Sequence, residues 1–323
     1  MVTRRLRDIG EHGWIARLLR TVPSGPRVLV GPGDDAAAVR APRGAVLLTT
    51  DTLVQGAHFQ LGWETHARLG QRALRINLSD VAAMGGRPLA ALVALEAPAN
   101  LPVAVLDGVM RGMIAEARRH GVDVVGGNLA AAPRLAITVT LVGEAIGPPV
   151  TRAGARAGDD VWVTGTLGGA GVAVRALLGG NSTRRPPVPV RLGAARLVAP
   201  LAHAMIDVSD GLVQDLGHVC DASGVAAEVE VDRMPVAPAC RRALGGDAAA
   251  FAATAGEDYE LLLAVPPRHE RRLQRLLPRL GCALTRIGRI VPVAPRSPTV
   301  RLGDDGGRPV RFGRSGFDHF RPR

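Results

Sequence analysis

The chain has 323 residues, carries a formal net charge of +11 at pH 7 and is 47% apolar. This length is enough for two domains of ordinary size. No apolar run reaches the roughly 18 residues that a membrane-spanning helix requires. The basic N-terminus has no continuous apolar segment ahead of a cleavage site, which argues against a signal peptide. We therefore expect a cytoplasmic protein with no membrane partner.

The positive charge comes entirely from arginine, because all 40 basic residues are Arg and the sequence has no Lys. A basic surface can attract nucleic acid. Here the arginines are scattered and aromatic residues make up only 3%, so the pattern of a single-strand groove is missing. A general replacement of Lys by Arg explains the composition better, and we expect no nucleic-acid partner. The missing Lys also excludes a P-loop and a protein kinase, which both place a Lys on the phosphates of ATP.

Cysteine usage points to a reducing compartment. Cys220, Cys240 and Cys282 lie far apart in the sequence. Their odd number and their spacing fit neither a zinc site nor a disulfide framework. We expect them to be reduced and to serve mostly in packing.

The first half of the chain alternates between helix and strand patterns. Helices are marked by apolar residues at spacings of three and four, and strands by short runs rich in Val, Leu and Thr. In chain order the sequence predicts a helix over 6–19, strands over 27–31 and 45–54, a helix over 66–84, a strand over 88–98, a helix over 103–120, and strands over 122–128 and 134–147.

The second half follows a polar linker at 148–160. A strand, a Gly-rich turn at 164–171 and a helix come next, then an exposed loop at 181–190 that contains three Pro. Helices and strands continue to about residue 292, and a hairpin follows. The glycines of the turn do not match the G-x-G-x-x-G pattern, which makes a dinucleotide site improbable.

Acidic residues gather at the ends of these elements, beside Gly, Ser or Thr. They are Asp34, Asp35, Asp51, Asp80, Asp207, Asp210, Glu257 and Asp258. For any one of them a helix cap or a turn is the ordinary explanation. Together they indicate a Mg²⁺ site, because carboxylate and hydroxyl oxygens suit this ion and several carboxylates in one place repel unless cations lie between them.

The tripeptide GDD occurs twice, and its second copy argues for caution. Gly303, Asp304 and Asp305 lie inside TVRLGDDGGRPVRF. Alternating apolar and polar residues flank them, which predicts a β-hairpin with a tight turn. The first copy therefore has to be judged by its surroundings.

Those surroundings resemble a known family. In chain order, the motifs GPGDDAAAV, TTDTLVQGAHF, NLSDVAAMGGRP, MIDVSDGLVQDLGHVCDASG, AGEDYELL and GFDHF are similar to those of thiamine-monophosphate kinases. The match runs from about Val30 to Phe320. The wider superfamily also includes aminoimidazole ribonucleotide synthetase, selenophosphate synthetase and a hydrogenase maturation factor, but TDTLVQGAHF, GEDYELL and GFDHF favour the thiamine enzyme.

The resemblance implies an α/β (α+β) fold of two domains, of the aminoimidazole ribonucleotide synthetase type. Residues 1–148 would form an ATP- and metal-binding dimerisation domain, and residues 149–323 a C-terminal α/β domain. Strands of the first domain would form a barrel across a homodimer. The implied reaction is direct transfer of the γ-phosphoryl group of ATP, the co-substrate, to thiamine monophosphate, assisted by several Mg²⁺ ions.

The resemblance also implies roles for single residues. Its metal ligands would be Asp35, Thr49, Thr50, Asp51, Asp80, Asn128, Asp207 and Asp210, with Asp35, Asp51, Asp80 and Asp210 catalytic. ATP would contact Gly127, Asn128, Arg152 and Ser209, and thiamine monophosphate would contact His58, Glu257 and Phe317. Phe317 would stack on the cationic thiazolium ring.

One motif departs from the family pattern. Where the family usually has GGDTTR, this chain has GGNLAAAP, so Asn128 replaces the metal-binding Asp. An amide oxygen can still bind Mg²⁺, but it brings no charge. This change puts one metal ligand and part of the nucleotide contact in doubt.

Two alternatives to the kinase remain open from the sequence. The first is an ATP-dependent relative that acts on another substrate. The second is a non-catalytic or nucleic-acid-binding protein with the same fold, which the charge and Asn128 favour. A kinase assay with exchanged substrates separates the first from thiamine-monophosphate kinase, and the salt dependence of binding identifies the second.

Overall fold

The structure is a computed structural model that describes residues 4–33, 35–181, 183–295, 297–304, 306, 308–310 and 316. The chain divides into two compact units. The first consists of Met1–Val81 and Arg87–Ala145, and the second of Ala82–Gly86 and Ile146–Arg323. This mixed α/β architecture confirms the predicted fold class.

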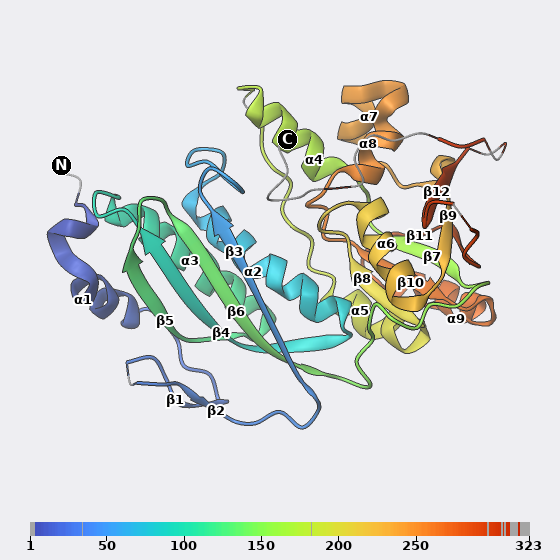
Figure 1. Cartoon of the computed structure of the whole chain (residues 1–323). Helices are drawn as coiled ribbons and strands as arrows, with labels where there is room; N and C mark the ends of the chain where they lie inside the picture. The colour runs from blue at the N-terminus through green and yellow to red at the C-terminus, as the bar shows by residue number, and fades with distance from the viewer. Residues whose placement is uncertain are drawn as a thin grey trace. The chain divides into compact units, whose positions relative to one another are not determined.

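A four-stranded sheet in the order β3-β6-β4-β5 is the centre of the first unit, and α2 and α3 lie behind it in Figure 1. Strands β1 and β2 form a separate two-stranded sheet. The elements of this part of the chain are α1 (Leu6–Leu19), β1 (Val28–Val30), β2 (Ala38–Val39), β3 (Val46–Val54), α2 (His66–Ala83), β4 (Gly86–Ala97), α3 (Val103–His120), β5 (Asp123–Ala131) and β6 (Ala136–Ala145).

The predicted helices and strands of this half are confirmed to within a few residues. Helix α3 shows why. Its apolar residues, such as Leu106, Met110 and Met113, recur on one buried face, and Gly121 ends it in the left-handed conformation, φ 65°. Helix α1 differs in one detail, because Gly10 has a non-helical backbone and kinks it.

The second unit is built on a six-stranded sheet in the order β12-β9-β11-β7-β10-β8. All its pairings are antiparallel except β12 with β9. Its elements are β7 (Asp160–Thr164), α4 (Gly169–Leu178), α5 (Leu192–Val198), β8 (Ala204–Asp207), α6 (Leu212–Ser223), β9 (Ala226–Glu230), α7 (Pro238–Leu244), α8 (Ala248–Thr254), β10 (Leu261–Val265), α9 (Glu270–Leu276), β11 (Leu284–Val291) and β12 (Val300–Gly303).

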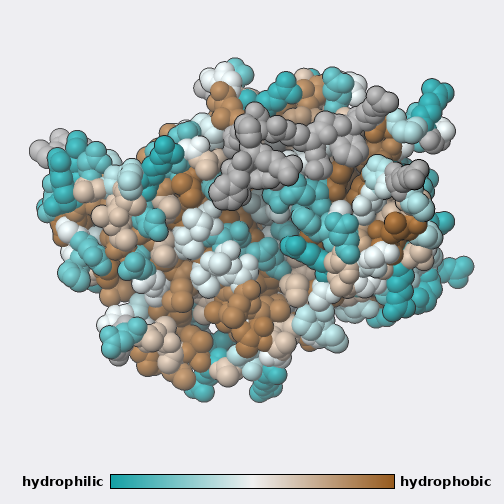
Figure 2. Space-filling model, viewed as in Figure 1, coloured by the Kyte–Doolittle hydropathy of each residue, from teal (hydrophilic) through white to brown (hydrophobic). Residues whose placement is uncertain are grey.

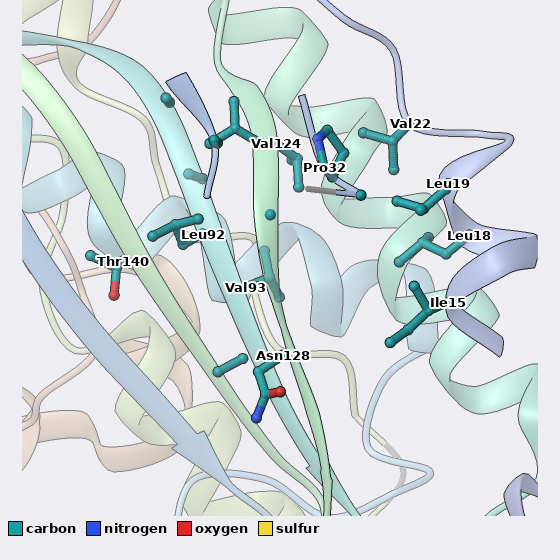
Figure 3. A pocket seen from close by; sticks show the side chains of 18 of the residues that line it. Ile15, Leu18, Leu19, Val22, Pro32, Leu92, Val93, Val124, Asn128 and Thr140 are labelled. Atoms are coloured by element: carbon teal, nitrogen blue, oxygen red, sulfur yellow. The ribbon is translucent and has the colours of Figure 1, made fainter. Parts of the chain in front are cut away.

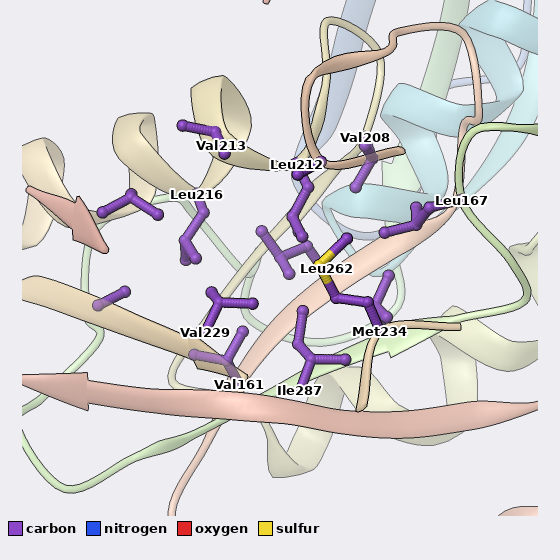
Figure 4. Packing of buried hydrophobic residues seen from close by; sticks show 14 of the residues in the cluster. Val161, Leu167, Val208, Leu212, Val213, Leu216, Val229, Met234, Leu262 and Ile287 are labelled. Carbon is purple, nitrogen blue, oxygen red and sulfur yellow. The ribbon is translucent and has the colours of Figure 1, made fainter. Parts of the chain in front are cut away.

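Apolar cores lie on both faces of this sheet. Alternate residues of a strand point to opposite faces. Val161 and Leu262 therefore pack with α6 in one core, which Figure 4 shows with Leu212 and Leu216. Their neighbours Trp162 and Leu263 pack with α5 and α9 in the other. The strands are buried on both sides, as their nearly continuous apolar sequence indicates.

Two smaller expectations are tested by the same unit. The hairpin after Gly303 is confirmed, because the Asp304 carboxylate accepts the N–H of Arg308 at 2.7 Å, and Val310 N–H donates to Leu302. The Asp304 carboxylate of the second GDD thus binds the main chain, as the side chain of a turn residue does. The described residues of the loop, 181 and 183–190, are irregular as expected, but they are not wholly exposed, since the side chains of Arg185 and Val188 are buried.

We expect Gly112→Ala to destabilise the protein, because a Cβ there would lie 1.9 Å from the carbonyl oxygen of Ala67 on α2. Overpacking of this kind costs about 1–3 kcal/mol of unfolding free energy. Urea denaturation measures it. The matched control is Gly217→Ala in α6, where a Cβ would have no atom within 4 Å. This variant should gain up to about 1 kcal/mol, and equal losses in both would contradict the packing argument.

Candidate functional site

Three of the predicted metal ligands gather in the first unit. Thr49 and Asp51 are alternate residues of β3, so their side chains share one face of the strand. Asp80 reaches the same place from α2, where its Oδ2 accepts a hydrogen bond from Thr49 Oγ1 at 2.5 Å. These are hard oxygen donors of the kind that Mg²⁺ prefers.

Thr50 lies on the opposite face of β3. Its hydroxyl lies 3.0 Å from the hydroxyl of Thr140 and donates to the carbonyl of Val139. The structure therefore separates the Thr50 side chain from Thr49, Asp51 and Asp80. Its metal role stays a prediction.

A cavity of about 660 Å³ lies in the first unit, with walls from α1, β4, β5 and residues 32, 33, 35–37 and 39. Figure 3 shows apolar side chains that line it, among them Ile15, Leu18 and Leu19 of α1, followed in the chain by Val22 and Pro32. Its polar lining residues include Asp35, Asn128 and Thr140. A largely apolar cavity with a few polar groups is the usual form of a site for a small organic ligand.

Gly127 brings the backbone of β5 close to β4. A Cβ at this position would lie 1.8 Å from the carbonyl oxygen of Val93, so no larger residue fits there. Asn128, which follows, is exposed and pairs in register with Ala94. The predicted nucleotide contacts Gly127 and Asn128 are therefore both at the cavity.

His58 has a fixed ring orientation. Its Nδ1 accepts the N–H of Val54 at 2.9 Å, so the neutral ring carries its proton on Nε2. The buried Arg72 donates to the carbonyl of His58 from both of its terminal nitrogens. Its ion pair with Glu64 holds Arg72 itself in place.

In the second unit, Asp207 ends β8 and a tight turn leads to α6. Both Asp210 and Gly211 donate their N–H groups to Asp215 Oδ2, at 3.0 and 3.1 Å. Gln214 Nε2 donates to Asp210 Oδ2 at 3.1 Å. Burial raises the pKa of Asp215 to about 8, and the charges of Asp210 and Asp207 add to the effect. Asp207 and Asp210 thus bring two further carboxylates to this turn, and carboxylate oxygens suit a hard cation.

The pairing of β8 with β10 brings a second motif beside this turn, since Leu261 is opposite Asp207. Glu257 N–H donates to the carbonyl of Ser209 at 2.7 Å, and Tyr259 N–H donates to Val208 at 2.7 Å. Glu257 and Tyr259 have φ of 70° and 50°. Such values are rare for residues other than Gly and cluster at functional sites.

Asp258 ties this segment to the Gly-rich turn. Its buried carboxylate accepts the N–H of Gly168 at 2.7 Å and of Ala170 at 3.5 Å. The N-terminus of α4 is therefore capped from within the protein. Gly165 and Gly168 have positive φ, so the backbone of the turn accounts for these glycines without a dinucleotide.

Two predicted residues lie apart from these contacts. Arg152 is exposed, and its carbonyl accepts a hydrogen bond from Ser223, so its nucleotide contact stays a prediction. Phe317 lies outside the described residues, as does Asp34. Its neighbour Gly316 is described, and a Cβ there would lie 2.8 Å from the carbonyl oxygen of Asp210.

The metal ligands do not form a complete centre by themselves. Among the residues that the structure describes, no three His, Cys, Asp or Glu side chains group closely enough to hold an ion. Mg²⁺ commonly takes one or two carboxylates and completes its shell with phosphate oxygens and water. Thr49, Asp51 and Asp80 fit that use, as does the acidic turn at Asp207 and Asp210.

The sequence patterns missed Asp215 and Arg185. Asp215 supports the turn of Asp210, and its position in the first turn of α6 was the available signal. Arg185 contacts Glu257, but it lies in a Pro-rich stretch whose composition indicated an exposed loop.

The expectation for the cysteines holds where it is tested, since all three are free and Cys220 and Cys240 are buried. In the described part of the chain no helix is long and apolar enough to cross a bilayer.

We expect Asp258→Asn to flatten the dependence of stability on pH. Burial raises the pKa of Asp258 to about 7. The folded protein then binds this proton more tightly than the unfolded chain, so the stabilisation present below the ordinary pKa of 3.8 is lost as the pH rises to about 7.

The amide keeps an acceptor for Gly168 N–H but has no proton to lose. Between about pH 5 and pH 8 the unfolding free energy of the variant should fall less than that of the wild type, by at most about 3 kcal/mol. Chemical denaturation at both pH values tests this. Parallel losses in the two proteins would contradict it.

Comparison with known proteins identifies the family. Residues 33–145 match AIR synthase related protein, N-terminal domain, and residues 156–299 match the C-terminal domain of the same family. Thiamine-monophosphate kinase of Mycobacterium tuberculosis is 40% identical over 271 residues, 80% of this chain and 81% of the relative. That of Salmonella typhimurium is 36% identical over 96% of this chain and 98% of its own length.

Solved structures agree. The structure described as AaThiL complexed with AMPPCP and TMP is 32% identical, with a TM-score of 0.75, and covers 99% of this chain and 100% of its own. Identity above 30% over nearly the full length of such relatives, together with the matching motifs, supports one conclusion: this chain belongs to the thiamine-monophosphate kinase family.

Proposed function

We propose that this chain transfers the γ-phosphoryl group of ATP to the phosphate of thiamine monophosphate, giving thiamine diphosphate and ADP. The carrying observation is that Thr49, Asp51 and Asp80, from two motifs, gather in one place in a chain of this family. The relative complexed with AMPPCP and TMP supports the same pair of substrates.

The chemistry asks little covalent help from the protein. Phosphoryl transfer depends on in-line alignment and on neutralising the charge of the transferred group. The acceptor phosphate is already ionised, so a general base is not required. Mg²⁺, when bound, supplies the neutralising charge that a Lys supplies in other kinases. Asp35, Asp51, Asp80 and Asp210 would hold it, with Thr49, Thr50, Asn128 and Asp207 as further proposed ligands.

The cavity of the first unit suits the nucleotide. Apolar residues of α1 in its wall can cover a flat base, and Asp35, Gly127 and Asn128 also line it. Ser209 and Arg152 are the proposed ATP contacts of the second unit. His58, Glu257 and Phe317 are the proposed contacts of thiamine monophosphate. We propose the cytoplasm as the place of this reaction.

The homodimer is also a proposal, and the surface of β3 supports it. Val46 and Leu48 are 53% and 71% exposed on an edge strand of the sheet, and Leu92 of β4 is 42% exposed. Figure 2 shows apolar side chains gathered over this part of the first unit. Long apolar edge strands pair with another chain unless they are covered. A second copy of the same sheet is the cover we propose.

The central test is whether the protein forms thiamine diphosphate. Purified protein with Mg²⁺, ATP and thiamine monophosphate should release ADP and form thiamine diphosphate, identified by chromatography. Thiamine without the phosphate should give none. Asp210→Asn should lower kcat/KM at least about 100-fold with an unchanged fold, because a charge-stabilising group is lost. ATP binding without formation of thiamine diphosphate would favour the non-catalytic alternative.

Asn128→Asp tests the departure from the family pattern. Restoring the carboxylate at the cavity should lower the Mg²⁺ concentration for half-maximal activity about three- to tenfold, because an added charge near a surface cation contributes about 1 kcal/mol. Titration of activity with Mg²⁺ measures the change. An unaltered midpoint would mean that this position does not face the metal.

Leu48→Glu tests the dimer. A charge on the exposed face of β3 should raise the dimer dissociation constant at least about 100-fold, since a buried unpaired charge costs several kcal/mol. Sedimentation velocity measures the mass. Leu178→Glu is the matched control, because Leu178 is also exposed but belongs to α4 of the second unit. A wild-type chain that sediments as a monomer would overturn the proposal.

A further inference from the structure

Two arginines of the irregular segment 183–191 contact two carboxylates of the motif GEDYE. Arg185 Nη2 contacts Glu257 Oε2. Arg191 forms a two-pronged pair with Glu260, with Nε to Oε2 and Nη2 to Oε1 both at 2.6 Å. The same short segment therefore contacts the motif at two positions, and these contacts explain why Arg185 is buried and Arg191 is partly buried, whereas the neighbouring Arg184 is exposed.

The backbone of the motif GEDYE has an unfavourable conformation. Glu257 and Tyr259 both have positive φ, which costs of order 1–3 kcal/mol for each residue and persists only where the surroundings enforce it. The N–H groups of both are bound to Ser209 and Val208. Asp258 between them is bound to Gly168. The main chain at Glu257 is thus well fixed, and Arg185 adds a fixed direction for the side chain.

The burial of the two partners is unequal. The side chain of Arg185 is 3% exposed, whereas that of Glu257 is 27% exposed. A ligand at the surface can therefore touch the carboxylate but cannot reach the guanidinium. A cation this deeply buried requires an anionic partner, and because Arg185 meets one carboxylate oxygen, the carboxylate cannot rotate without breaking the pair.

We propose that Arg185 is a positioning residue for substrate binding, which acts by fixing the Glu257 carboxylate that thiamine monophosphate contacts. This inference rests on the proposed function and extends it to a residue buried behind the substrate contact. Arg191 forms a similar ion pair, but its role is structural. Its partner Glu260 is 4% exposed and also accepts a hydrogen bond from Thr164, so the pair supports the fold and does not face a ligand.

The experiment is a double-mutant cycle with Arg185→Met, Glu257→Gln and the double variant, assayed for thiamine diphosphate formation. Each single variant should raise the KM for thiamine monophosphate about tenfold with kcat changed less than about threefold, since the interaction serves binding. The double variant should be no worse than Glu257→Gln alone, because Arg185 acts through that carboxylate. Arg185→Lys keeps the charge and should restore part of the lost affinity.

Arg191→Met is the matched control from the same segment. It should lower the thermal midpoint, because Glu260 is left buried without its partner, and leave the KM for thiamine monophosphate within about twofold of the wild type. If Arg185→Met is too unstable to assay, Arg185→Lys and Glu257→Gln complete the cycle.

The outcomes separate the two proposals. Suppose that the wild type forms thiamine diphosphate and that the rise in KM of the double variant equals the product of the rises in the two single variants. This result would overturn the role of Arg185 and leave the proposed function standing. A wild-type KM in Arg185→Met, or an equal KM effect in Arg191→Met, would do the same. A wild type that forms no thiamine diphosphate would overturn the proposed function, and this inference with it.

Discussion

The pairing of β8 with β10 is the contact on which the polar groups of the second unit depend. It sets the acidic turn after Asp207 beside the segment that begins at Glu257, through main-chain hydrogen bonds that need no particular side chain. The side chains of these two segments are not needed for this pairing, so they can be charged. Carboxylates crowded at a buried edge repel, and here each is held by a separate donor. Asp215 and Asp258 accept backbone N–H groups, while Glu257 and Glu260 face arginines.

Much of the fold could be predicted from the sequence, because its strongest signals are local. Apolar spacing and terminal Gly residues located α3, and alternating residues located the hairpin after Gly303. The partners of single side chains were less predictable. The Pro-rich composition of the segment around Arg185 indicated exposure, and only long-range packing against Glu257 buries this arginine. Thr49 and Thr50 are neighbours of the same type in one motif, yet strand alternation places them on opposite faces.

The two units carry their charges differently. In the first, the acidic residues come from a strand and a helix that are packed by apolar side chains, and Thr49 joins them by one short hydrogen bond. In the second, the acidic residues lie at turns, and main-chain N–H groups of the neighbouring segments donate hydrogen bonds to the buried carboxylates of Asp215 and Asp258. Asn128, which stands where the family usually has Asp, is at an exposed position of β5. The lost carboxylate changes the charge at the ligand site but does not disturb the packing of the strand.

The division of the chain between the units has a consequence for synthesis on the ribosome. Residues 82–86 belong to the second unit, although the chain on both sides of them belongs to the first. Ala82 and Ala83 pack in a core with Trp162 and Leu263, which are made much later. Domains generally fold as they emerge, but here the nascent first unit carries an apolar stretch whose partners do not yet exist. Until translation passes β10, that stretch is a natural binding point for a chaperone.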